Sequence, residues 1–204
     1  MPRLAPCTIF LLVGTAPITA QVRFDARLGV MASTKLVADS LGTEPLTLRQ
    51  NLAPTIALAL DTRLNPRNRV GITAGVSRSN LVLRAPSGER ALLVLTTWTP
   101  TVVLTHELTP SLAASVAAGL ILYDPDVRLG TVFSDNAPAR PLAGVGLHLR
   151  RVVSAHAAVG VDLTYDVHGF MTRSLANRGF VGQWAVHRVT LGVTLGHRDD
   201  APQP

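Results

Sequence analysis

The feature that most constrains this sequence is an alternation of apolar and other residues with a period of two, which recurs in eight segments after residue 21. The first segment alternates Val22, Phe24, Ala26, Leu28 and Val30 with Arg23, Asp25, Arg27, Gly29 and Met31. Successive side chains of a β-strand point to opposite faces, so this pattern predicts a sheet with one apolar face and one polar face. No run of about 18 or more apolar residues follows the N-terminal region, which argues against a transmembrane helix.

The connections between the segments alternate in length. After residues 22–31, the further strands are expected at 50–63, 69–82, 90–106, 112–123, 141–151, 155–167 and 183–196. Loops are expected at 33–48, 84–89, 124–140 and 168–182, and tight turns join the other segments. Up-and-down membrane barrels have this asymmetry, and eight strands close a sheet without leaving an edge. The predicted fold is therefore all-β, an eight-stranded antiparallel up-and-down transmembrane β-barrel.

The alternation alone fits two barrels of opposite sense. A membrane barrel carries its apolar face outside, whereas a soluble lipocalin-like barrel carries it inside. Charged residues make up only 16% of this chain, and its one lysine is Lys35. A soluble domain has about a quarter charged residues, and a solvated face is usually rich in lysine and glutamate. The composition therefore favours the membrane barrel, and a soluble periplasmic barrel is the alternative.

The polar face carries charges of both signs on strands that would become neighbours when the barrel closes. An unpaired charge inside a narrow barrel costs several kcal/mol, so these charges are expected to pair. We predict a charge network in the lumen made of Arg23, Asp25, Arg27, Asp162, Asp166 and Arg188. Placement of these side chains on the outer wall would contradict the membrane interpretation.

The first twenty residues have the features of a cleavable secretory signal peptide. Arg3 supplies a positive charge, residues 4–16 are mostly apolar, and Ala20 is a small residue suited to cleavage before Gln21. The only cysteine, Cys7, falls inside this segment, so the mature chain would have no disulfide and no thiolate metal site. The expected organisation is a signal peptide at 1–20, an outer-membrane β-barrel at 21–197 and a disordered tail at 198–204.

Two segments carry a resemblance to a known family. In each, one strand ends, a short turn with proline or serine follows, and the next strand begins: Thr105-His106-Glu107-Leu108-Thr109-Pro110-Ser111-Leu112-Ala113 and Leu149-Arg150-Arg151-Val152-Val153-Ser154-Ala155-His156-Ala157. With the alternation, this pattern resembles small outer-membrane β-barrel proteins of the eight-stranded OmpA/OmpX type, over roughly residues 22–197. The resemblance implies a location in the outer membrane of a Gram-negative bacterium and contact with its lipid and lipopolysaccharide.

No catalytic residue, metal ligand or cofactor site is predicted. A serine hydrolase needs a serine beside a histidine that an acid holds in place. None of the six histidines has a serine two positions on, the same-face spacing within a strand; Asp166, His168 and Ser174 come nearest to such a group. His148 and His156 flank an expected turn, but two histidines make a poor zinc site. We therefore expect a chain that is not an enzyme.

The expected function is a structural or surface-interaction role in the outer membrane. The lumen of an eight-stranded barrel is filled by side chains, which excludes a wide, porin-like pore. We expect a monomer that could meet an extracellular ligand through loops 33–48, 124–140 and 168–182. The scattered arginines form no basic run with interleaved aromatic residues, so no nucleic-acid partner is expected. The alternatives are a lipid-modifying outer-membrane enzyme, a narrow channel or carrier for a small apolar molecule, and the soluble barrel.

Overall fold

The computed structural model describes residues 22–41, 44–126, 139–154, 156–170, 177 and 185–197. The predicted signal peptide, the predicted tail and most of loops 124–140 and 168–182 lie outside these residues. The described strands are β1 (Val22–Ser33), β2 (Lys35–Leu41), β3 (Glu44–Gln50), β4 (Ala53–Asn65), β5 (Asn68–Ala85), β6 (Gly88–Glu107), β7 (Leu112–Pro125), β8 (Ala139–Val152), β9 (Ala157–His168) and β10 (Val186–His197). Within this part of the chain, no helix is long and apolar enough to cross a membrane.

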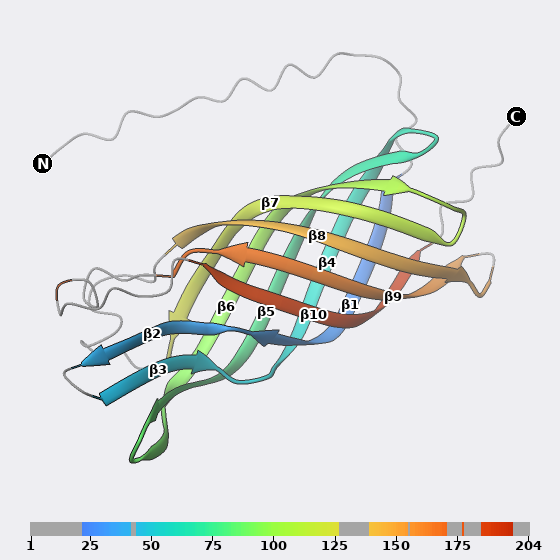
Figure 1. The fold of residues 1–204 in the computed structure, drawn as a ribbon. Coiled ribbons are helices and arrows are strands. Elements are labelled where there is room, and N and C mark those ends of the chain that lie inside the picture. Colours follow the sequence, from blue (N-terminus) through green and yellow to red (C-terminus); the bar gives the residue numbers. More distant parts are fainter. Residues whose placement is uncertain are drawn as a thin grey trace, which may run out of the picture.

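Eight of the strands close into an antiparallel barrel in the order β5-β4-β1-β10-β9-β8-β7-β6, with β6 pairing back onto β5 (Figure 1). The closure is staggered. Following the paired residues once around the barrel from Arg23 leads back to β1 at Ser33, ten residues further along. A staggered barrel of eight strands has an interior just wide enough to be filled by side chains. The predicted fold class is confirmed.

The barrel carries its apolar face on the outside. Large apolar side chains are exposed on every one of the eight barrel strands; Leu28 on β1 and Leu191 on β10 are 57% and 58% exposed. The alternate positions turn inward, where Asp25 and Arg188 are only 3% and 5% exposed. This sense is the one that a lipid environment requires, and it is opposite to that of a soluble barrel.

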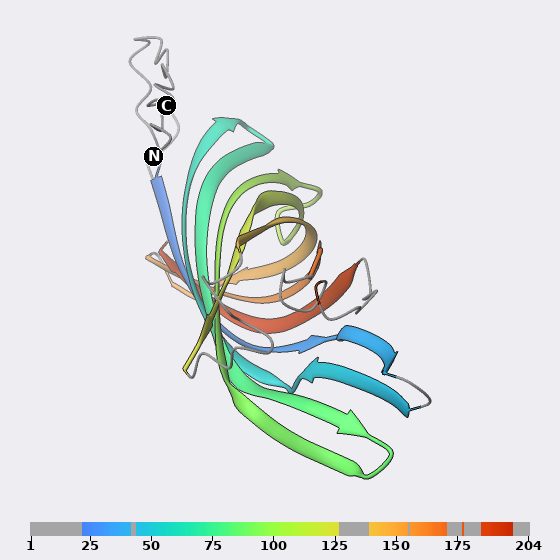
Figure 2. The ribbon, with the colours of Figure 1, turned by 90° about the vertical axis from the view of Figure 1, so that its left-hand side faces the viewer.

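Three short turns at one end of the barrel join β4 to β5, β6 to β7 and β8 to β9. In each, a side-chain oxygen accepts a hydrogen bond from a backbone N–H: Asn65 Oδ1 from Asn68 at 2.9 Å, Thr109 Oγ1 from Leu112 at 3.0 Å, and Ser154 Oγ from Ala157 at 3.1 Å. Asparagine, threonine and serine favour turns because they form such local bonds. These three turns lie at one end, as predicted, and the hairpins β2–β3 and β5–β6 extend from the other (Figure 2). The prediction of a loop at 84–89 was wrong: β5 continues to Ala85 and β6 begins at Gly88, so a two-residue turn joins them, and Gly88 supplies the positive φ of 132° that this turn requires.

The prediction of a loop at 33–48 was wrong. Most of this segment forms β2 and the beginning of β3. The end of β3 pairs with the C-terminal part of β5, for example Thr47 with Arg84. The period-two pattern is lost here because a register shift lies between Lys35 and Val37, so that Leu36 and Val37 are both buried. A β-bulge of this kind kinks a strand and re-aims its side chains.

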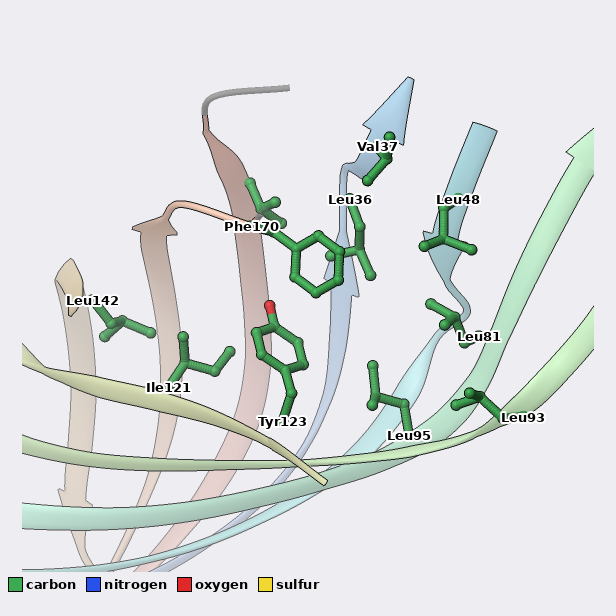
Figure 3. Packing of buried hydrophobic residues seen from close by; sticks show 11 residues of the cluster. Leu36, Val37, Leu48, Leu81, Leu93, Leu95, Ile121, Tyr123, Leu142 and Phe170 are labelled. Carbon is green, nitrogen blue, oxygen red and sulfur yellow. The ribbon is translucent and has the colours of Figure 1, made fainter. Parts of the chain in front are cut away.

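A cluster of buried apolar residues fills the barrel at the end from which these hairpins extend (Figure 3). We call it the apolar plug; its members are Leu36, Val37, Leu48, Leu81, Leu93, Leu95, Ile121, Tyr123, Leu142, Phe170 and Val186. The rings of Tyr123 and Phe170 meet edge to face with centroids 5.1 Å apart. The Tyr123 hydroxyl lies 3.1 Å from His168 Nε2, which gives the buried phenol a polar partner.

Candidate functional site in the barrel lumen

The turn end of the lumen holds a cluster of ion pairs. Asp61 Oδ2 accepts from Arg23 Nη2 at 2.9 Å, and its other oxygen accepts from Arg69. Arg23 Nε also lies 3.1 Å from Asp25 Oδ2, while Arg150 approaches the second oxygen of Asp25 at 3.7 Å. All five side chains are less than a quarter exposed. Mutual pairing is what permits so many charges to be buried together.

The six residues predicted as a charge network all line lumenal cavities, but they do not form one continuous network. Arg23 and Asp25 belong to the cluster at the turn end. Asp162 pairs with His148 rather than with an arginine. Arg188 lies opposite Asp166 in the β9–β10 register. Its Nη2 donates to Ser77 and Thr97 toward the hairpin end of the lumen.

Three members of this cluster were not predicted: Asp61, Arg69 and Arg150. The signal that could have found them is the one that found Arg23 and Asp25: each occupies an inward position in its strand. Asp61 pairs directly with Arg23 in the β1–β4 register, so charges of opposite sign at inward positions of neighbouring strands identify the cluster.

The middle of the lumen holds a serine, a histidine and an aspartate in a hydrogen-bonded chain. Ser115 Oγ lies 2.7 Å from His148 Nε2, and His148 Nδ1 lies 2.5 Å from Asp162 Oδ1. The three residues come from the adjacent strands β7, β8 and β9. This group was not predicted, because the same-face spacing within one strand cannot reveal a serine and a histidine that neighbouring strands supply.

Two small cavities meet at this group. One, of about 130 Å³, is lined by Ser115, His148 and Asp162 and extends toward Arg188. The other, of about 60 Å³, is lined by His148 and Asp162 and extends toward the β6–β7 turn. Arg27 lines both cavities, and its buried Nε has no hydrogen-bond partner.

The described residues contain no group of three or more histidine, cysteine or acidic side chains that could hold a metal ion. The two histidines that flank the β8–β9 turn are not brought together. His148 points into the lumen, where it contacts Ser115 and Asp162, whereas the ring of His156 stacks on that of His197 with centroids 6.3 Å apart. Of the Asp166, His168 and Ser174 group, the serine lies outside the described residues.

Comparison with known proteins shows the fold rather than a role. No protein-family model matches the sequence, and no curated protein is similar to it. Among solved structures, the outer-membrane protein OprG from Pseudomonas aeruginosa is similar with a TM-score of 0.52 and 11% identity, over 86% of this chain and 94% of that one. The outer-membrane protein AlkL, determined in lipid bilayers, is similar with a TM-score of 0.50 and 14% identity over 100% of both chains. This chain has the fold of a small outer-membrane β-barrel protein.

Proposed function

We propose that this chain is an outer-membrane barrel without a wide pore, whose hairpin end serves as a surface for interaction. The observation that carries the proposal is the filling of the lumen along its length. Ion pairs occupy the turn end, hydrogen-bonded polar side chains the middle, and the apolar plug the hairpin end. Cavities of about 130 and 60 Å³ separate these groups, which is too little space for a continuous wide water column.

The outer wall supports residence in the membrane, with the hairpins outside and the turns in the periplasm. Membrane barrels have short periplasmic turns and longer outer connections. Trp98 and Tyr165 lie toward the hairpin end with 49% and 40% of their surface exposed. Amphipathic rings are favoured at the boundary between lipid and water, and the Tyr165 hydroxyl has a polar partner there in His187 Nδ1 at 2.5 Å.

The chemistry of the hairpin end favours an anionic partner. Lys35, Arg78, Arg84 and Arg90 are exposed on β2, β5 and β6, beyond or near the end of the apolar wall. Arginine matches the geometry of phosphate oxygens, and basic side chains at a membrane surface attract anionic headgroups. We propose that these residues contact the phosphate groups of lipopolysaccharide while the barrel itself is monomeric.

Single-channel recording on the purified chain in a planar lipid bilayer tests the absence of a wide pore. The expected result is no stepwise conductance of porin size, whereas a general porin inserted in parallel shows it. A double variant, Tyr123→Ala with Phe170→Ala, should raise the conductance because it opens the apolar plug. Leu64→Ala is the matched control, since this outward side chain is 59% exposed. Porin-sized steps from the unaltered chain would contradict the proposal.

A further inference from the structure

We propose that Ser115, His148 and Asp162 form a serine nucleophile site inside the lumen that hydrolyses small esters with a short acyl group. This activity goes beyond the proposed structural and surface role, and it departs from the expectation that the chain is not an enzyme. The three residues lie on three adjacent strands of one closed sheet.

The hydrogen bonds assign a role to each group. An ionised carboxylate only accepts, so the short contact of 2.5 Å to Asp162 requires that His148 carry its proton on Nδ1. In the neutral imidazole, His148 Nε2 is then an acceptor, and the Ser115 hydroxyl, 2.7 Å away, donates to it. A serine bonded to a histidine that is oriented by an aspartate is the arrangement that activates a hydroxyl as a nucleophile.

The backbone register leaves room for this contact. Ser115 pairs with Gly146 between β7 and β8, and His148 pairs with Asp162 between β8 and β9. A Cβ atom at position 146 would lie 2.7 Å from Ser115 Oγ and 3.0 Å from His148 Nε2. Any larger residue there would push the serine and the histidine apart, so glycine at 146 is a condition for the site.

Arg27 is placed to stabilise the charge that an attacked carbonyl develops. Its side chain lines both cavities beside His148 and Asp162, and its buried Nε–H has no hydrogen-bond acceptor in the described part of the chain. Catalysis of acyl transfer depends on donors directed at the developing oxyanion. Backbone N–H groups within a strand are engaged in the sheet, so a side-chain donor has to take this role.

The reaction balances without a cofactor. Ser115 Oγ bonds to the carbonyl carbon of the ester while its proton moves to His148 Nε2. The bond from this carbon to the alcohol oxygen then breaks, and the alcohol leaves with the proton from Nε2. Water attacks the acyl-serine, gives a proton to His148 and releases the carboxylic acid, while Ser115 recovers its proton. The sum is ester plus water to carboxylic acid plus alcohol.

The cavity limits the substrate. The space beside Ser115 is about 130 Å³, enough for a short acyl group but too small for the long chain of a membrane lipid. The apolar plug closes the hairpin end of the lumen, whereas the cavity of about 60 Å³ leads from His148 to the β6–β7 turn. Substrates would therefore enter at the turn end, through this cavity between the ion pairs and the β6–β7 turn, and this end is the periplasmic one in the proposed orientation.

Covalent labelling of the folded barrel tests the proposal. The barrel in detergent micelles is incubated with methanesulfonyl fluoride, a serine reagent no larger than a short acyl ester; the intact mass is then measured, and the adduct is mapped to a peptide. The expected result is a single adduct on Ser115. Asp162→Asn should slow labelling by at least about 100-fold, since loss of the orienting aspartate slows serine proteases even more. Ser77→Ala is the matched control, because Ser77 is buried in the same lumen but contacts Thr97 rather than a histidine.

Two further measurements make the test decisive. Heat-modifiable migration on a gel confirms that each variant is folded. Labelling of the unaltered barrel tests the proposal even where a variant fails to fold. p-Nitrophenyl acetate should be hydrolysed and p-nitrophenyl palmitate should not, with Gly146→Ala reducing the acetate rate at least tenfold. Absence of an adduct on Ser115 in the folded, unaltered barrel would overturn the proposal, as would labelling that Asp162→Asn leaves unchanged. Either result leaves the outcome of the conductance experiment unchanged, so failure of this proposal can be told apart from failure of the proposed function.

Discussion

Asp61 is the residue whose removal should disturb the lumen most. Its two carboxylate oxygens accept from Arg23 and Arg69, and the three side chains are 11%, 17% and 6% exposed. Asp61→Asn keeps the shape of the side chain and removes its charge. Two arginines then remain inside the barrel with one carboxylate fewer, so the barrel should be destabilised.

The structure sets the size of this effect. At an effective dielectric constant of about 20, an ion pair at 2.9 Å is worth about 6 kcal/mol before desolvation. Arg23 keeps its contact with Asp25 at 3.1 Å, and an asparagine oxygen can still accept one hydrogen bond. Breaking a buried pair by altering one partner typically costs about 3–5 kcal/mol. We therefore expect the free energy of unfolding of Asp61→Asn to fall by about 3 kcal/mol.

Urea unfolding in lipid vesicles, followed by tryptophan fluorescence, measures the change. The matched control is Glu89→Gln. Glu89 pairs with Arg49 at the same distance of 2.9 Å, but both side chains are 41% exposed. An exposed pair contributes about 0–1 kcal/mol, so the control should lose less than about 1 kcal/mol. Equal losses for the two variants would refute the argument that burial makes the Asp61 cluster matter.

Three further predictions concern other parts of the barrel. Gly119→Ala should lower the urea midpoint and cost roughly 1–3 kcal/mol, because a Cβ atom there would overlap the Pro100 carbonyl oxygen; an unchanged midpoint would contradict this close packing. Phe170→Ala, which removes a 1% exposed ring from the apolar plug, should cost about 3–5 kcal/mol in the same assay, and a loss below about 1 kcal/mol would show that the plug is loosely packed. Tyr165→Phe removes the hydroxyl that contacts His187 at a 40% exposed position, so equilibrium unfolding should detect less than about 1 kcal/mol.

The sequence predicts the barrel strands well because one physical condition acts along each of them. A strand with lipid on one side and a packed lumen on the other must alternate, as Leu191 and Arg188 do on β10. The hairpin β2–β3 lies beyond the apolar wall, so its strands do not have lipid on one face and the packed lumen on the other. Its strands are fixed by pairing with the distant β5 and by the register shift before Val37, and neither is visible in a local pattern.

Part of the candidate site is likewise predictable from the local pattern, and part of it depends on long-range strand pairing. That inward charges lie in the lumen follows from the position of each in its strand. The group of Ser115, His148 and Asp162 depends instead on which residues face each other across the long connection from β7 to β8 and the short turn from β8 to β9. The β8–β9 turn was expected near 152–154, whereas Val152 pairs with Ala158. A turn displaced by even one residue assigns His148 a different partner, so the group becomes visible only once the register is known.

The central claim is that lipid surrounds the apolar wall and the polar positions face the lumen. Residues 21–197 contain no cysteine, so single cysteines on β10 can carry a nitroxide spin label without interference. For the barrel in lipid vesicles, we predict frequent collisions of lipid-dissolved oxygen with a label at Leu191, which is 58% exposed, and few with one at Thr194, which is 7% exposed. Equal or inverted oxygen accessibility at these two positions would contradict the membrane barrel.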